Sequence, residues 1–263
     1  MQTMPRKIAN SFLIGCDPEL FAIAANGHHV AVPEVGGTRG EIGTDHGGRI
    51  LELRPEPSRL AQSQVFRLRR LLAKLAVHPS VVNLRLRAGA INAHDTIGGH
   101  VHFDLPIRYD AEHRLLLSKK TQATVTALDR IHDYLVALDI LPKTEAALRL
   151  AAGAGYGRKG DVRDCEGHLE YRTFPSWLHH PHAAMLVLTL SKLAGVDPTI
   201  ADNFNAETAS LQGIRDALEG AAAEDHDAAY AHEKIQLERL TGMDLNICLR
   251  KQWRTDAVVA PAK

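Results

Sequence analysis

The sequence predicts an α+β fold with a mainly antiparallel sheet. Segments with strand character are concentrated in the first 110 residues and return near residue 169, whereas helical periodicity dominates the other stretches. The two kinds of segment do not alternate regularly, as they would in a doubly wound fold. Of the 263 residues, 45% are hydrophobic and 24% are charged, which is typical of a folded globular protein.

The first predicted helix covers residues 58–78, with Ser58 as its N-cap and Pro79 as the residue that ends it. Its apolar stripe recurs at spacings of three and four residues, through Ala61, Val65, Leu68, Leu72 and Leu75. A strand rich in β-branched residues and leucine is predicted over 81–86.

The second half of the sequence is mostly helical in pattern. It predicts a helix over 111–139, a shorter helix after Pro142, a glycine-rich loop at 153–157 and a strand over 169–174. Residues 181–240 are predicted to form three helices, broken near Gly195 and Gly220. We expect one domain over 11–250, helical from about 181, with frayed termini at 1–10 and 255–263.

Charge and cysteine content restrict the classes of partner. Lys plus Arg and Asp plus Glu number 31 each, and this balance argues against a nucleic-acid partner. Cys16, Cys165 and Cys248 form no CxxC pair, so neither a thiolate zinc site nor a disulfide framework is suggested. The longest apolar stretch, 183–190, is too short for a membrane span. We therefore expect a cytoplasmic protein without a membrane partner.

Four short segments place ionisable side chains on one face of a strand, because side chains i and i+2 of a strand project together. The pairs are Asp17 with Glu19, Glu52 with Arg54, His100 with His102, and Glu170 with Arg172. The solvated side of a sheet explains any single pair, but it explains the whole set less well. Carboxylates and imidazoles bind divalent metals, and guanidinium groups bind phosphates. If the strands are neighbours, the crowded carboxylates require cations between them.

The donor types indicate which cation would fit. Several carboxylates with an imidazole and no thiolate suit Mg²⁺ or Mn²⁺. A His-x-His pair with a distant Glu can also hold Zn²⁺, as in hydrolases, although the HExxH motif is absent.

A glycine-rich loop adds a candidate phosphate-binding segment. Gly153, Gly155 and Gly157 permit a close approach of the backbone to a ligand, and nearby cations are supplied by Arg158, Lys159 and Arg163. The GxxxxGK[ST] spacing of a Walker loop is missing, and an ordinary surface loop is the alternative interpretation.

Taken in order, these segments resemble the phage-encoded carboxylate–amine ligases, the type 2 amidoligase family related to glutamine synthetase and glutamate–cysteine ligase. The matching stretches lie between Gly15 and Trp177 and read GCDPELF, GTDHGGRILELRPEP, GGHVHF and YGRKGDVRDCEGHLEYRTFPSW. Each stretch is short, and the specificity comes from finding four of them in the expected order.

The resemblance implies a twisted antiparallel sheet of the glutamine-synthetase type, with helices on its convex face and ATP with Mg²⁺ on its concave face. It implies that the metal ligands are Glu19, Glu52, His100 and Glu170. Arg172 resembles the arginine that meets the γ-phosphate or acyl phosphate, and Arg54 is similar in placement. Asp17 and His102 would have secondary ligand or substrate-binding roles. Arg158, Lys159 and Arg163 would face the nucleotide.

The function expected on these grounds is an ATP- and Mg²⁺-dependent ligase that joins a carboxylate to an amine, on an amino acid or peptide, through an acyl phosphate. Phosphorylation turns a carboxylate oxygen into a good leaving group, and metals and arginines neutralise the charge on the transferred phosphoryl group. Two alternatives remain open: a zinc-dependent hydrolase that uses His100 and His102, and a non-catalytic phage-derived binding module. Relatives with this core often assemble into homo-oligomers, but no feature of the sequence fixes a number.

Overall fold

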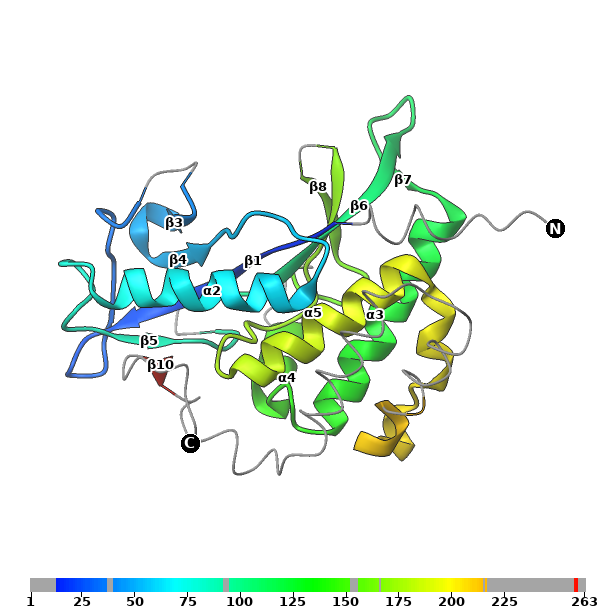
Figure 1. The fold of residues 1–263 in the computed structure, drawn as a ribbon. Coiled ribbons are helices and arrows are strands. Elements are labelled where there is room, and N and C mark those ends of the chain that lie inside the picture. The colour runs from blue at the N-terminus through cyan, green and yellow to red at the C-terminus, as the bar shows by residue number, and fades with distance from the viewer. Residues whose placement is uncertain are drawn as a thin grey trace.

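The computed structural model describes residues 13–36, 40–91, 95–151, 156–165, 167–214 and 216, together with the backbone of 258–259. Within these ranges the chain forms one sheet with helices packed against it, which confirms the predicted α+β class (Figure 1). The predicted helices beyond residue 216, the loop residues Gly153 and Gly155, and both predicted frayed termini except 258–259 lie outside the described residues. The single-domain boundaries therefore stay a prediction.

The sheet is antiparallel throughout, except where β10 runs parallel to β5. Its longest path has the order β10-β5-β1-β6-β9-β8; in addition, β2 and β4 pair with β1, β3 with β4, and β7 with β6. The strands are β1 (Ile14–Ile23), β2 (His29–Val30), β3 (Ile42–Asp45), β4 (Ile50–Leu53), β5 (Arg85–Arg87), β6 (Gly99–Tyr109), β7 (Leu115–Leu117), β8 (Val162–Cys165), β9 (His168–Tyr171) and β10 (Val258–Val259).

The α-helices are α2 (Ala61–Ala76), α3 (Lys119–Ala137), α4 (Lys143–Ala151) and α5 (Pro181–Val196). Three short 3₁₀ helices accompany them: η1 (His46–Gly48), η2 (Pro198–Asn203) and η3 (Ala206–Thr208). In Figure 1, α2 and α5 lie across one side of the sheet, where α2 contacts β1 and β4 and α5 contacts β6.

Alternation along β1 separates the two faces of the sheet. Ile14, Cys16 and Leu20 belong to the main hydrophobic core together with the buried side chains of α2 and α5. Asp17 and Glu19, between them in the sequence, project to the opposite face. A second small cluster, of Phe21, Ile23, Ile50 and Ile97, continues that opposite face beyond Glu19. Helices therefore cover one face and leave the other free to form a site.

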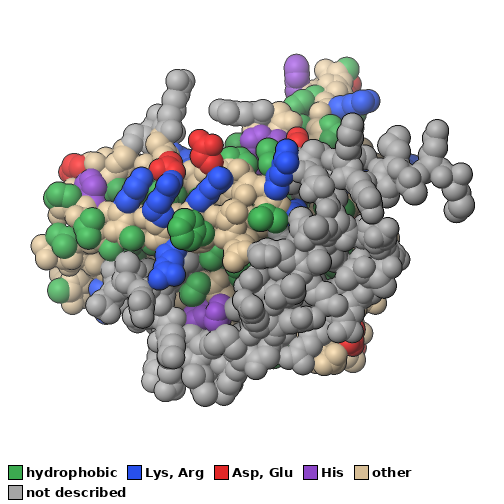
Figure 2. Space-filling model, in the orientation of Figure 1, with side chains coloured by type: hydrophobic (Ala, Val, Ile, Leu, Met, Phe, Trp, Pro, Cys, Tyr) green, Lys and Arg blue, Asp and Glu red, His purple; other side chains and the backbone are tan. Residues whose placement is uncertain are grey.

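Helix α2 keeps the predicted stripe but begins later than predicted. Ala61, Leu68, Leu72 and Leu75 are buried. Ser58 is not the N-cap, because its backbone N–H and C=O pair with Ile14 at the start of β1 and hold it in an extended conformation. The outward side of α2 is basic (Figure 2), and two of its cations, Arg70 and Lys74, pair with Glu41.

Three further predicted boundaries are wrong, and in the first two a turn or a cap outweighs local propensity. Residues 81–84 form turns after α2, and strand β5 starts only at Arg85. The predicted helix over 111–139 begins at Lys119, because the Ser118 hydroxyl caps it by accepting from the Thr121 N–H at 3.1 Å. Residues 115–117, just before this cap, pair with β6 as β7. Residues 169–174 form a strand only as far as Tyr171.

Candidate active site

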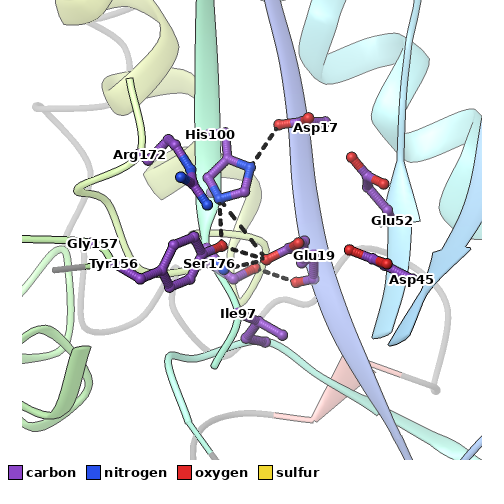
Figure 3. Close-up of polar contacts among 12 residues, drawn as sticks. Asp17, Glu19, Asp45, Glu52, Ile97, His100, Tyr156, Gly157, Arg172 and Ser176 are labelled. Atoms are coloured by element: carbon purple, nitrogen blue, oxygen red, sulfur yellow. Dashed lines mark hydrogen bonds and ion pairs between the residues drawn. The ribbon is translucent and has the colours of Figure 1, made fainter. Parts of the chain in front are cut away.

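Strand register brings the four polar segments together. Glu19 of β1 lies opposite Glu52 of β4, and Asp17 lies opposite His100 of β6. On the next strand pair, His102 lies opposite Glu170 of β9. The order β4-β1-β6-β9 therefore converts four separate sequence patterns into one polar surface, as Figure 3 shows for β1, β4 and β6.

These side chains border a pocket of about 730 Å³. The predicted site residues that line it are Asp17, Glu19, Glu52, Arg54, His100, His102, Arg163 and Arg172. Glu170 is fully buried beneath them and contacts three of them: His100, Arg163 and Arg172. Arg158 and Lys159 are exposed and are not among the lining residues. Lys159 instead pairs with Asp133 of α3.

His100 is the centre of the polar contacts in Figure 3. Its Nδ1 lies 3.1 Å from Asp17 Oδ1 and 3.2 Å from Glu170 Oε1. On the other side of the ring, Nε2 lies 2.9 Å from the Tyr156 hydroxyl and 4.0 Å from Glu19 Oε2. The imidazole is therefore within reach of three carboxylates from β1 and β9.

The glycines of the GGHVHF segment make this close approach possible. A Cβ at Gly98 would stand 2.6 Å from His100 Nε2 and would also overlap the Arg149 guanidinium. The Gly98 N–H donates to Glu19 Oε2 at 2.6 Å, which fixes the carboxylate against the end of β6. Sequence patterning alone does not identify this contact.

Opposite charges set the protonation of Asp17 and the two histidines. Burial opposes ionisation of Asp17, but the imidazoles of His102 and His100 outweigh it and hold the Asp17 pKa well below its usual range. Burial likewise disfavours the imidazolium forms, yet Asp17 raises the pKa of His102 to about 10. The pKa of His100 is also raised, by Asp17 and Glu19 acting against burial.

The other two lining carboxylates are shifted in the opposite direction. Burial raises the pKa of Glu19 despite the nearby His100. Burial and the Asp17 charge raise the pKa of Glu52 to about 8, even though the Arg54 guanidinium donates to the Glu52 carboxylate. Raised carboxyl pKa values indicate that negative charge on these groups lacks compensation in the protein alone.

Unpartnered polar atoms also gather here. Several buried atoms at this site, within the described ranges, have no hydrogen-bond partner: Asp17 Oδ1, His100 Nδ1, His102 Nε2, Glu170 Oε1 and Arg172 Nε. The first four lie 3.0–3.2 Å from oppositely charged neighbours, but at angles that do not make hydrogen bonds. Buried atoms of this kind call for a ligand or ion, and carboxylate oxygens with one imidazole fit Mg²⁺ or Mn²⁺.

Tyr156 and Arg149 are parts of the site that the sequence analysis did not identify. The guanidinium groups of Arg172 and Arg149 lie 4.2 and 4.5 Å from the centre of the Tyr156 ring. Arg149 is buried and donates to the carbonyls of Ile97, Arg172 and Thr173, so it joins the ends of two strands. The tyrosine in the YGRKG segment was the only available signal for this pair.

Further pocket-lining residues come from the GTDHGG segment and the β8–β9 hairpin. They are Thr44, Asp45, His46, Cys165 and His168. Asp45 caps η1 through the His46 N–H, and this turn forms the wall of the pocket next to Glu52. Cys16 is 3% exposed and belongs to the core, as expected for a small apolar side chain.

No helix within the described ranges combines the length and the apolar character needed to cross a bilayer. No curated protein matches the chain. The solved structures that resemble it include GmaS without ligand, at 17% identity and a TM-score of 0.42, covering 90% of this chain and 69% of GmaS. A bifunctional glutathione synthetase from Pasteurella multocida has 12% identity and a TM-score of 0.47 over 92% of this chain and 48% of that enzyme. TM-scores below 0.5 do not establish a common fold.

The sequence profile of the family described as phage phiEco32-like COOH.NH2 ligase-type 2 matches residues 14–243. This range includes all four polar segments and every residue of the candidate active site named above. The chain therefore belongs to the type 2 COOH–NH₂ ligases, a family of carboxylate–amine ligases.

Proposed function

We propose that this protein uses ATP and Mg²⁺ to join a carboxylate to an amine through an acyl phosphate, on an amino acid or a peptide. The observation that carries the proposal is the convergence of Asp17, Glu19, Glu52 and His100 on one pocket that three arginines also line, with Glu170 buried directly beneath them. Family membership favours this reaction over the zinc hydrolase and the binding module.

In the proposed mechanism, Glu19, Glu52, His100 and Glu170 would hold the divalent cations. The bound cations would screen the charge of the triphosphate and of the oxygen that accepts the phosphoryl group. Asp17 and His102 lie beside these ligands and are proposed to have secondary ligand or substrate-binding roles, with Asp17 Oδ1 3.0 Å from His102 Nε2.

The arginines supply the remaining positive charge. Arg172 packs on the Tyr156 ring and lies 3.6 Å from Glu170, so its guanidinium is held at the pocket wall before any ligand binds. We assign to Arg172 the stabilisation of the transferring phosphoryl group, with Arg54 in a supporting role on the β4 side. Arg163 pairs with Glu170 and is half-exposed at the pocket edge, and we propose that it faces the nucleotide. Arg158 and Lys159 stand outside the pocket, so nothing in their placement supports a nucleotide contact.

The substrate carboxylate would attack the γ-phosphorus of ATP, and ADP would leave. The amine would then attack the acyl carbon and lose a proton to solvent, and phosphate would leave with the bonding electrons. The products are an amide, ADP and phosphate, and no side-chain nucleophile is needed.

The test is release of ADP by the purified protein with Mg²⁺, ATP and a panel of amino-acid pairs. Glu52→Ala should reduce the rate by at least about a hundredfold, since it removes a metal ligand. Glu41→Ala is the matched control, because Glu41 pairs with Arg70 and Lys74 on the surface and should keep full activity. Hydroxylamine in place of the amine should trap the acyl phosphate as a hydroxamate. Failure of the native protein to bind ATP with Mg²⁺ at millimolar concentration would refute the proposal.

A further inference from the structure

A second group of metal-ligating side chains lies at the edge of the same pocket. Cys165 ends β8 and His168 begins β9, and the two residues face each other across a two-residue turn. Gly167 in that turn has a φ of +93°, a conformation that glycine adopts without strain. Because directly opposed residues of an antiparallel pair share a face, the hairpin presents a thiol and an imidazole side by side.

The neighbouring strand β6 supplies a third donor. His102 Nδ1 lies 3.0 Å from His168 Nε2, and the Cys165 thiol lies close enough to interact with the His102 ring. The ligand atoms of His102, Cys165 and His168 all lie within 4.8 Å of one another. Tetrahedral Zn²⁺ with bonds of about 2.0 Å to nitrogen and about 2.3 Å to sulfur separates its donors by roughly 3.3–3.6 Å. Small side-chain rotations therefore suffice to reach that geometry.

The other nitrogen of His102 is already oriented. Its Nε2 lies 3.0 Å from Asp17 Oδ1, so a metal bound at Nδ1 would displace the proton of that nitrogen and leave the Nε2 proton beside the carboxylate. A histidine held between a carboxylate and a metal is the usual outer-shell arrangement of zinc sites. All three donor residues line the pocket and are partly exposed, so a cation can enter from solvent.

We propose that His102, Cys165 and His168 form a binding site for Zn²⁺, separate from the carboxylate site proposed for Mg²⁺. Two imidazoles and a thiolate select a borderline-soft transition metal and are poor ligands for Mg²⁺. Three protein donors leave the fourth position of the tetrahedron open toward the pocket. The site is formed by tertiary structure from a Cys-x-x-His hairpin and a distant histidine, a pattern without the CxxC spacing that signals thiolate zinc sites in sequence.

The test is a titration of the reduced, metal-free full-length protein with Co²⁺, which reports thiolate ligation through a near-ultraviolet charge-transfer band. The native protein should develop this band at one equivalent and lose it when Zn²⁺ is added. Cys165→Ser should abolish the band, and His168→Asn should weaken Zn²⁺ binding at least tenfold. Asp17→Asn, which removes the partner of His102 Nε2, should weaken Zn²⁺ binding by about tenfold to a hundredfold.

Two controls separate this site from its neighbours. Cys16→Ser should keep the band, because Cys16 lies in the core, and His100→Asn should keep it because His100 belongs to the carboxylate site. No nucleotide is present, so the result does not depend on the proposed ligase reaction. Absence of the band in the native protein, or an equal band in Cys165→Ser, would overturn the zinc site. Circular dichroism tests whether the two hairpin variants, Cys165→Ser and His168→Asn, are folded. If one of them is unfolded, the result of the other decides.

Discussion

Replacing Glu52 by glutamine should stabilise the metal-free protein at neutral pH while it removes a proposed metal ligand. Glu52 is 8% exposed, and its pKa is raised from 4.5 to about 8. Between these two values the folded state holds a proton that the unfolded chain releases, so stability falls as pH rises from about 4.5 through 8. Each pH unit above 4.5 lowers the free energy of unfolding by about 1.4 kcal/mol. At pH 7 the native protein has therefore lost about 3 kcal/mol of stability through Glu52.

Glutamine mimics the protonated carboxyl and lacks this titration. The variant should therefore match the native protein near pH 5 and exceed its stability progressively toward pH 8. Urea unfolding of the two metal-free proteins at pH 5, 6, 7 and 8 measures the difference. Added Mg²⁺ with ATP should raise the native midpoint and leave that of the variant nearly unchanged.

Glu41→Gln serves as the control. Lys74 and Arg70 lower the Glu41 pKa, so its removal should slightly destabilise the protein at neutral pH, the opposite sign. A stability difference between native and Glu52→Gln that does not change with pH, or a variant less stable at pH 8, would refute the reasoning that Glu52 is buried without enough compensating charge.

Three other substitutions test the arginine–tyrosine arrangement. Arg172→Lys keeps the charge but loses the planar packing on Tyr156, so kcat from steady-state kinetics should fall by about 10²-fold. Nucleotide affinity, measured by calorimetry, should change less. Tyr156→Phe keeps the ring and loses the hydroxyl that lies 2.9 Å from His100, so the rate should fall no more than about tenfold. A loss as large as that of Arg172→Lys would mean that the hydroxyl itself is essential. Arg149→Met leaves three carbonyls without the guanidinium donor, so the free energy of unfolding measured in urea should fall by about 3 kcal/mol or more. A variant as stable as the native protein would exclude this bracing role.

Local periodicity was enough to identify most of the candidate site. The period-two alternation in the segments around Asp17, Glu52 and His100 places charged and apolar side chains on opposite faces, and the structure has the same separation. Helices α2 and α3 were predictable for a similar reason, since a 3.6-residue apolar stripe must find a core to cover it.

Competition between local signals was harder to predict. Ser58 has the chemistry of an N-cap, yet its backbone pairs with Ile14 instead. Residues 115–117 read as helical until β6 offers them a strand partner and Ser118 provides a later cap. In both cases a contact with a distant segment outweighed a preference of less than about 1 kcal/mol per residue.

By itself, the sequence determined which side chains share a face of each strand, because that depends only on residues two apart. Only the tertiary structure decided that Glu19 faces Glu52, that Arg149 and Tyr156 brace Arg172, and that Lys159 turns to Asp133. It also decided that His102 meets Cys165 and His168. Register and strand order follow from burial summed over the whole sheet, since sliding one strand by a single residue would turn its apolar side chains away from the core.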